Sequence, residues 1–308
     1  MEIPDVIRAL PKAELHIHLL GSVRPKTLVE LVKAEGIHTP YDSQEEMRRL
    51  FKYQDFSHFI EVYSQLICLI QHEEHFERLA YEALEDCAEQ NIRYVELSFS
   101  SRDHTRQGLE FEDMVDAINS GIDRARSEFG IIADIRIDLV RNYGPETAMQ
   151  TLDDIKRKPD NIFSVDLGGS EDKYPPEPFT GVYERAKEMG LHLVAHAGEA
   201  AGPQSIWDAI KYLDVEGVGH AVSAVKDARL MEYMREKQIA IEACPVSNVR
   251  TRVVESIKHH PIREYYDSGL MVTVNSDDPT LFQTNLNNEY PQLHTYLDNP
   301  FLTVLGTG

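Results

Sequence analysis

Eight short apolar runs recur along the chain and predict a series of buried β-strands. Most of these runs are continuous rather than alternating, which is typical of parallel strands that are covered on their outer side. The predicted strands are Ala13–His18, Ile92–Phe99, Ile132–Val140, Ile162–Leu167, His192–Ala195, Gly217–His220, Ala240–Ala243 and Met271–Asn275. The pattern therefore favours an α/β protein built on a parallel sheet.

Amphipathic segments with helical spacing lie between most of these runs. A longer insert of about residues 25–90 separates the first two strands and carries several helices of its own. Predicted helices include Phe56–Ile70, His75–Glu89, Leu109–Phe129, Pro178–Met189 (followed by Gly190, a suitable C-cap), Asp227–Lys237 and Pro261–Ser268. Strand–helix alternation repeated about eight times predicts one (β/α)₈ (TIM) barrel that spans residues 1–308 as a single domain. A doubly wound sheet is less well supported, because no Gly-x-Gly-x-x-Gly follows the first strand.

Composition narrows the class of protein. The chain has 308 residues, 42% of them hydrophobic, which is enough for a large core and excludes a disordered chain. Lys and Arg number 31 against 52 Asp and Glu, a net charge of −21 that disfavours nucleic acid and anionic membranes as partners. Three dispersed cysteines suit a reducing compartment, and neither a signal peptide nor a run of membrane-spanning length is present. We therefore expect a cytoplasmic protein.

Two histidines at the end of the first predicted strand are candidate metal ligands. His16 and His18 occupy positions i and i+2, so a β-strand directs both side chains to the same side. Two neutral imidazoles make half of a mononuclear zinc or iron site. The pair alone is weak evidence, since two histidines on one strand face are common.

Further polar residues stand where later apolar runs stop. The carboxyl ends of all strands of a barrel meet on one face, where active sites are built, so residues at these ends are expected to lie together. The residues in question are Gly169, His196, Glu199, His220, Glu242, Asp277 and Asp278.

This set of side chains has a coherent chemistry. Three histidines and one aspartate suit a single Zn²⁺ that keeps a water, whose pKa falls from 15.7 to about 7. Glu199 can donate or accept a proton near that centre, and His220 can orient the water or take its proton. Asp278 can hydrogen-bond a polar ring nitrogen. The inventory predicts metal-assisted hydrolysis of a planar, nitrogen-rich electrophile.

Four segments resemble the adenosine deaminase family of the amidohydrolase superfamily. The resemblance runs from about Ile7 to Tyr290, and the motifs are specific as a set. The segments are Pro-Lys-Ala-Glu-Leu-His-Ile-His at residues 11–18, His-Ala-Gly-Glu at 196–199, Gly-His at 219–220 and Ser-Asp-Asp-Pro at 276–279.

The resemblance implies a role for each matching residue. Glu199 would protonate the purine N1, His220 would handle the attacking water and Asp278 would bond N7. The backbone N–H of Gly169 would meet N3. One zinc ion would be held by His16, His18, His196 and Asp277, and the site would be oriented by Asp166, Glu242 and Ser247.

One departure from the family pattern concerns the substrate. Adenosine-specific members usually carry an acidic residue after His-x-His-Leu that bonds the ribose 5′-hydroxyl, and here that position is Leu20. Segments 51–63 and 196–210 look like members that act on 6-aminodeoxyfutalosine, an adenine nucleoside with an aryl-bearing group at its 5′ side, made in an alternative menaquinone pathway. We therefore expect Leu20 to line space for that group and adenosine to be the second choice. Free adenine is disfavoured, because adenine-specific relatives tend to have Asp-His where this chain has Gly219-His220.

The C-terminal segment 291–308 is atypical for the family. Pro291 and Pro300 are predicted to break a final helix, so the last barrel helix is expected to be missing. The outer side of strands eight and one would then be exposed or covered in a homo-oligomer.

Three other classes fit less well. A dihydroorotase or phosphotriesterase type needs a bridging lysine near strand four, and Phe163–Ser170 has none. Zinc deaminases of nucleic-acid bases use His-x-Glu with Pro-Cys-x-x-Cys, whereas Cys244 has no second cysteine nearby. An inactive nucleoside-binding barrel remains the non-enzymatic alternative, and the intact ligand set together with Glu199 argues against it.

Overall fold

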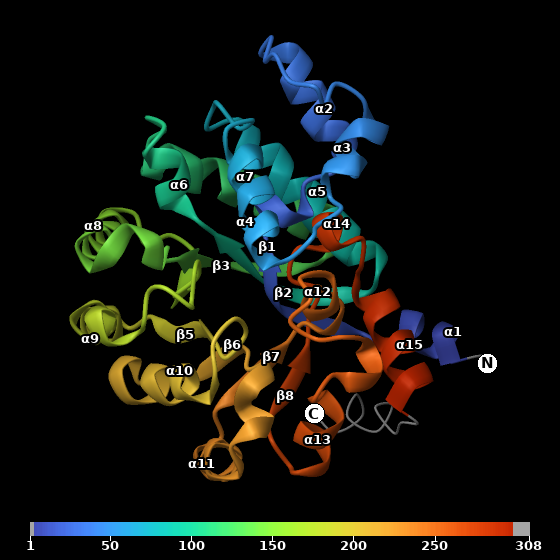
Figure 1. Cartoon of the computed structure of the whole chain (residues 1–308). Helices are drawn as coiled ribbons and strands as arrows, with labels where there is room; N and C mark the ends of the chain where they lie inside the picture. The colour runs from blue at the N-terminus through green and yellow to red at the C-terminus, as the bar shows by residue number, and fades with distance from the viewer. Residues whose placement is uncertain (1–2, 298–308) are drawn as a thin grey trace.

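Eight parallel strands follow one another in the order β1 to β8 and form a nearly closed barrel (Figure 1). The computed structural model describes residues 3–297. The strands are β1 Lys12–His18, β2 Ile92–Phe99, β3 Ile132–Asp138, β4 Ile162–Asp166, β5 His192–Ala197, β6 Gly217–His220, β7 Ala240–Ala243 and β8 Val272–Val274. The predicted TIM barrel is confirmed.

Helices surround the barrel, and the insert after β1 contributes α2 to α5 (Figure 1). Within residues 3–297, no helix combines the length and the apolar character needed to cross a bilayer. The helices are α1 Ile3–Ala9, α2 Pro25–Ala34, α3 Gln44–Leu50, α4 Phe56–Ile67, α5 His75–Glu89, α6 Ser101–Thr105, α7 Phe111–Phe129, α8 Gly144–Arg157, α9 Thr180–Glu188, α10 Pro203–Asp208, α11 Ala228–Lys237, α12 Pro245–Arg250, α13 Ile262–Asp267, α14 Pro279–Phe282 and α15 Leu286–Leu297.

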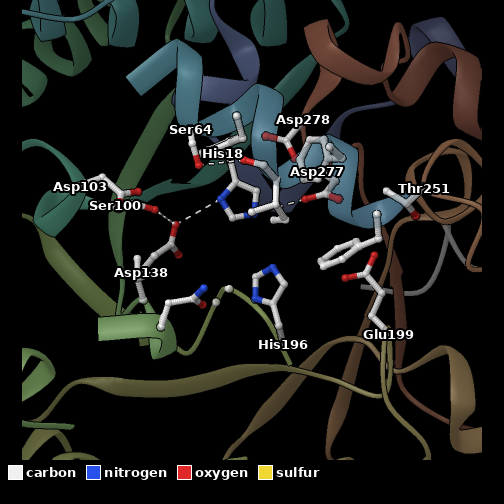
Figure 2. A pocket seen from close by; sticks show the side chains of 18 of the residues that line it. His18, Ser64, Ser100, Asp103, Asp138, His196, Glu199, Thr251, Asp277 and Asp278 are labelled. Carbon is white, nitrogen blue, oxygen red and sulfur yellow. Dashed lines mark hydrogen bonds and ion pairs between the residues drawn. The ribbon is translucent and has the colours of Figure 1, made fainter. Parts of the chain in front are cut away.

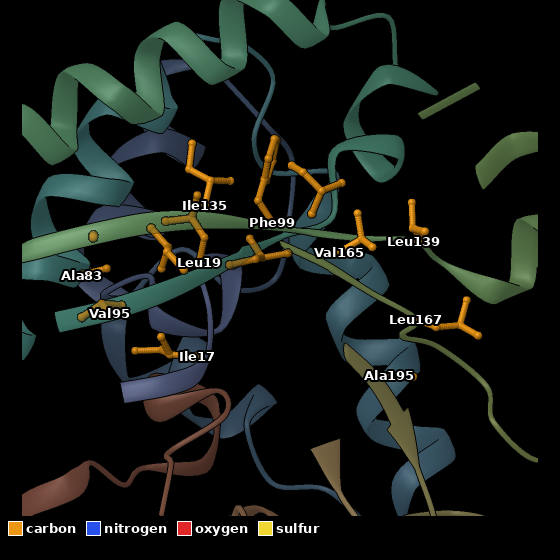
Figure 3. Close-up of a cluster of buried hydrophobic side chains, with 14 of the residues drawn as sticks. Ile17, Leu19, Ala83, Val95, Phe99, Ile135, Leu139, Val165, Leu167 and Ala195 are labelled. Carbon is orange, nitrogen blue, oxygen red and sulfur yellow. The ribbon is translucent and has the colours of Figure 1, made fainter. Parts of the chain in front are cut away.

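Alternation along the strands separates an apolar outer layer from a polar interior. Phe99, Ile135 and Val165 are buried and pack in a cluster beside the surrounding helices (Figure 3). Successive side chains of a strand point to opposite faces, so their neighbours Arg136 and Ser164, which pair in register, face the interior. Strand β3 thus alternates between apolar and polar residues, unlike the continuous apolar runs predicted for most strands.

Some strand ends differ from the prediction. Strand β5 continues to Ala197, because His196 pairs with Gly219 and Ala197 with His220 of β6. His196 therefore lies within a strand rather than after it. Strand β3 ends at Asp138, two residues early, which puts this carboxylate at the carboxyl end of the barrel.

The seam between β8 and β1 is closed by the segment that follows β8. The His18 N–H donates to the Asp277 carbonyl at 2.8 Å, and the Asp277 N–H donates to the His16 carbonyl at 3.0 Å. Below them, Glu14 accepts hydrogen bonds from the Ser276 N–H at 2.6 Å and the Ser276 hydroxyl at 2.7 Å. The same bonds that close the barrel therefore bring Asp277 beside the two histidines.

Helix α15 corrects the prediction for the C-terminal segment. It continues through Pro291, although proline removes one helical hydrogen bond and its ring crowds the preceding turn. Packing outweighs this cost, because Leu286 and Leu293 are fully buried and α15 lies against α1 and β8. A final helix is therefore present and covers the outer side of β8, whereas Pro300 lies outside the described residues.

The buried carboxyl of Glu289, on α15, should make the stability of the folded protein depend on pH. This carboxyl accepts hydrogen bonds from the Thr284 hydroxyl at 2.8 Å and the Val246 N–H at 3.2 Å. Burial raises the pKa of Glu289 to about 8, despite these bonds. Because this pKa is raised on folding, its contribution is complete below about pH 4.5 and is lost as the pH rises towards 8.

The variant Glu289→Gln stays neutral at every pH and should lack this loss. We measure the free energy of unfolding of both proteins by urea denaturation. The value for the variant minus the value for the wild type should increase as the pH rises from 5 to 8, by at most about 1.4 kcal/mol per pH unit. A constant difference between the two proteins over this range would contradict the assignment.

Candidate active site

Four side chains from three strand ends converge inside the carboxyl end of the barrel. Asp277 Oδ1 lies 3.4 Å from His16 Nε2 and 3.2 Å from His18 Nε2. The rings of His16 and His196 are 4.6 Å apart between centroids. One candidate ligand atom from each of these four residues lies within 4.8 Å of the other three.

Carboxylates hold the outer nitrogen of each of the three histidines. When Nδ1–H donates to a carboxylate, the tautomer is set and Nε2 keeps a lone pair for a metal. The three pairs, measured from Nδ1 to oxygen, are His16–Glu242 at 2.9 Å, His18–Asp138 at 3.2 Å and His196–Asp166 at 3.0 Å.

This geometry fits a divalent metal ion. Ligand atoms about 2.0–2.1 Å from a tetrahedral zinc are about 3.3 Å from one another, close to the 3.2 and 3.4 Å that separate Asp277 Oδ1 from two imidazoles. His16 Nε2 is buried and has no hydrogen-bond partner. Among the described residues, these four could hold a metal ion.

The negative charges inside the barrel also favour the binding of a cation. Four buried carboxylates meet there, from Asp138, Asp166, Glu242 and Asp277. Arg136 is buried beside them and makes a two-pronged contact with Glu242, at 2.7 and 2.8 Å. One guanidinium offsets only part of this charge, and uncompensated buried charges are costly, so a bound divalent cation would stabilise the cluster.

Two site residues adopt left-handed backbone conformations that aim their side chains. His220 pairs with Ala197, whose side chain lies on the opposite face from His196, so a regular strand would turn His220 away. Its φ of 63° accompanies a ring 5.1 Å from that of His196. Asp277 has a φ of 65°. Such conformations are costly for non-glycine residues and cluster at functional sites.

Glu199 stands beside His220 with its side chain almost wholly buried. Its Oε2 lies 3.6 Å from His220 Nε2. Burial, and then the charge of Asp277, raises the pKa of Glu199 well above its usual value. A carboxyl whose pKa is raised keeps its proton more readily near neutral pH and is suited to donate it.

Glu171 holds the loop that carries Glu199. Its buried carboxylate accepts hydrogen bonds from successive backbone N–H groups, including those of Gly198, Glu199 at 3.1 Å and Ala200 at 2.7 Å. These bonds position the Glu199 backbone, and the carboxylate adds to the negative charge that raises the pKa of Glu199.

Asp278 lines the same space and carries an unpartnered oxygen that lies against Gly21. It is 2% exposed, and its Oδ1 has no hydrogen-bond partner. Burial and the neighbouring Asp277 raise the pKa of Asp278 well above the usual value. Gly21 makes room for it, since a Cβ there would lie 1.9 Å from Asp278 Oδ1.

A pocket opens above these groups (Figure 2). Its polar lining includes His18, His196, Glu199, Asp277 and Asp278, whose side chains face one space in Figure 2. Gly168 and Gly169 line it as well. Helix α4 lines the pocket mainly with apolar side chains, those of Phe56, Phe59, Ile60, Tyr63 and Ile67.

Comparison with known proteins agrees with this geometry. The family described as "Adenosine deaminase" matches residues 11–298. The chain belongs to the adenosine deaminase family. It is 37% identical over 300 residues to an aminodeoxyfutalosine deaminase of Streptomyces avermitilis, covering 96% of this chain and 84% of that protein.

Two solved structures extend the comparison. An adenine deaminase from Arthrobacter aurescens superposes with a TM-score of 0.91 at 30% identity, covering 94% of this chain and 89% of that one. An amidohydrolase from Burkholderia ambifaria, solved with bound Zn, has a TM-score of 0.87 at 29% identity, with 96% and 84% coverage. The protein is thus a deaminase that acts on the C–N bond of an amidine.

Leu20 does not occupy the position predicted for it in this deaminase. It begins a short 3₁₀ helix, Leu20–Ser22, and is absent from the residues that line the active-site pocket. It lines a small neighbouring cavity with Phe76 and Leu79 instead. The helical turn directs residue 20 towards α5, so the apolar wall of the pocket is supplied by α4.

The structure brings the other predicted residues of the family site together, and several of their partners were not foreseen. Ser247 donates to Asp277 Oδ2 at 2.6 Å. Asp138 fell inside the predicted strand Ile132–Val140. A strand predicted to end at Asp138 would have placed this carboxylate among the strand-end candidates. The roles of Arg136 and Glu171 could not be predicted from the sequence, because their hydrogen-bond partners are distant in the chain.

Proposed function

We propose that this protein is a zinc-dependent hydrolase that removes the 6-amino group of an adenine nucleoside. The observation that carries the proposal is the convergence of three Nε2 atoms and one carboxylate beside a buried glutamate whose pKa is raised, all in one pocket. When bound, Zn²⁺ supplies a Lewis acid and lowers the pKa of a water to about 7. The ligands would be His16, His18, His196 and Asp277.

Each remaining residue either holds the purine, transfers a proton or handles the attacking water. Glu199 gives its proton to N1, which makes C6 more electrophilic. Protonated Asp278 donates to N7 and the Gly169 N–H donates to N3, so the ring is held with C6 near the metal cluster. His220 handles the attacking water. Water adds to C6; one of its protons returns to the Glu199 carboxylate and the other goes to the amino group, which leaves as ammonia. The inosine-type product carries a carbonyl at C6 and a proton on N1.

The apolar side chains that α4 contributes to the pocket support 6-aminodeoxyfutalosine over adenosine as substrate. Phe56, Phe59 and Tyr63 of α4 form a wall that an aryl group could cover. A free adenine base would leave this wall in water. No lysine or arginine is among the residues that line the pocket, so a 5′-phosphate would find no cation there. Adenosine is the second candidate, and free adenine ranks below it, although similar proteins include an adenine deaminase.

Ammonia release from a panel of substrates tests the assignment. We expect kcat/KM for 6-aminodeoxyfutalosine to exceed that for adenosine by about tenfold or more, since partial burial of an aryl group contributes about 1–3 kcal/mol. Adenine and AMP should be poorer still. The variant Ile60→Gln, which places an amide in the α4 wall, should lower kcat/KM for the aryl nucleoside and leave that for adenosine nearly unchanged. A clear wild-type preference for adenosine would contradict the substrate assignment.

A further inference from the structure

Asn248 connects the two groups that act on the substrate. It lies on α12 and is fully buried. Its Nδ2 donates to Glu199 Oε1 at 3.2 Å and lies 3.1 Å from His220 Nδ1. Its Oδ1 lies 3.2 Å from His260 Nε2. One amide thus touches both candidate proton carriers and a third side chain behind them.

His260 decides which way this amide points. The Ile262 N–H donates to His260 Nδ1 at 3.2 Å, so that nitrogen carries no proton. Burial lowers the pKa of His260 to about 3, which keeps the ring neutral. The single ring proton therefore sits on Nε2 and donates to Asn248 Oδ1.

The opposite orientation of the amide is excluded by the same bonds. It would turn Nδ2 towards His260 Nε2, and both nitrogens of that ring would then have to accept, which a neutral imidazole cannot do. With Oδ1 engaged by His260, the two hydrogens of Nδ2 are left for Glu199 and His220.

We propose that Asn248 is a positioning residue that fixes the tautomer of His220 and selects the Glu199 oxygen that delivers the proton. Because His220 Nδ1 accepts from Asn248, a neutral His220 carries its proton on Nε2, which faces Glu199 Oε2 at 3.6 Å and Asp277 Oδ2 at 4.0 Å. Because Glu199 Oε1 accepts as well, the acidic proton resides on Oε2, the oxygen on the side of His220.

The inference rests on the proposed function and decides between two roles for His220. An Nε2 that already carries a proton donates a hydrogen bond to the attacking water and cannot take a proton from it in that state. His220 therefore orients the water, and Asn248 is what imposes this role.

The variant Asn248→Asp tests the assignment directly. When ionised, the aspartate can only accept through both oxygens, so one keeps the bond from His260 and the other needs the proton of His220 on Nδ1. We expect ¹H–¹⁵N spectra of the zinc-loaded, histidine-labelled protein to show the His220 proton on Nε2 in the wild type and on Nδ1 in this variant. The signal is assigned by its absence from His220→Gln. We also expect kcat to fall by about 100-fold or more with KM within about threefold.

Three further variants keep the test decisive. Asn161→Asp makes the same change just before β4, at the opposite end of the barrel, and should alter neither the tautomer nor kcat. His260→Ala removes the donor that orients the amide and should lower kcat by about tenfold, whereas His260→Gln retains a donor and should restore most of it.

The possible results separate this inference from the proposed function. An unchanged His220 tautomer in Asn248→Asp, with kcat equal to that of Asn161→Asp, would overturn the role of Asn248. If Asn248→Asp does not fold, equal kcat values for His260→Ala and wild type would overturn it instead. The predicted tautomers in a protein that releases no ammonia from any adenine compound would support Asn248 and overturn the proposed function.

Discussion

Replacing Glu199 by glutamine is expected to lower kcat by about 1,000-fold while zinc content and folding stay as in the wild type. The amide has the shape of the carboxyl group, and its Oε1 can still accept the hydrogen bond from Asn248 Nδ2. It has no acidic proton to give to the purine N1. The loss should therefore appear in kcat, with KM changed by less than about tenfold because the amide can still hydrogen-bond the ring.

The measurement is ammonia release under saturating substrate, together with metal analysis of the same sample. Glu236→Gln, an exposed glutamate on α11, is the matched control and should keep the wild-type rate. A Glu199→Gln enzyme with kcat within tenfold of the wild type would exclude Glu199 as the proton donor. An inactive nucleoside-binding barrel would show neither stoichiometric zinc nor activity that depends on Glu199.

Replacing Asp277 by asparagine is expected to remove both the metal and the activity, with a fall in kcat of more than about 1,000-fold. The change preserves the volume of the side chain but removes the only carboxylate in the four-residue group. An amide oxygen is a weaker ligand, and an outward-turned amide would place N–H groups against His16 and His18. Asp123→Asn, at an exposed position on α7, is the control.

Thermal unfolding gives a second readout that does not depend on turnover. A ligand that binds only the folded state at 100 times its Kd stabilises it by about 2.7 kcal/mol. Chelation should therefore lower the Tm of the wild type, and added Zn²⁺ should restore it. Asp277→Asn should respond to neither treatment, and a wild-type Tm that is indifferent to chelator would contradict a structural contribution of the metal.

The local pattern was sufficient for the architecture of the barrel. Strand–helix alternation is carried by neighbouring residues, so eight strands could be predicted with small errors at their ends. The errors arose where pairing with another strand decides the length, as at the extension of β5 to Ala197. Pro291 was misjudged for a related reason, because its cost is local and visible, whereas the packing that outweighs it comes from α1 and β8.

The chemistry of the candidate metal site could likewise be predicted from the sequence, because residues at the carboxyl ends of the strands share one face in any such barrel. The motifs around His16, His196 and Asp277 could be read without knowing how the chain folds. The partners that orient them could not. Asp138 meets His18 over a separation of 120 residues, and Arg136 meets Glu242 over 106.

Substrate selection depended most strongly on tertiary structure. The sequence by itself determined a barrel, a candidate metal-binding set of histidines and aspartate, and a glutamate beside them. Only the folded chain decided that Leu20 turns towards α5, that α4 forms the apolar wall, and that Asn248 joins Glu199 to His220. The physical reason is that hydrophobic periodicity and strand ends are local properties, whereas the direction of a side chain after a strand is set by hydrogen bonds and packing with residues far away in the sequence.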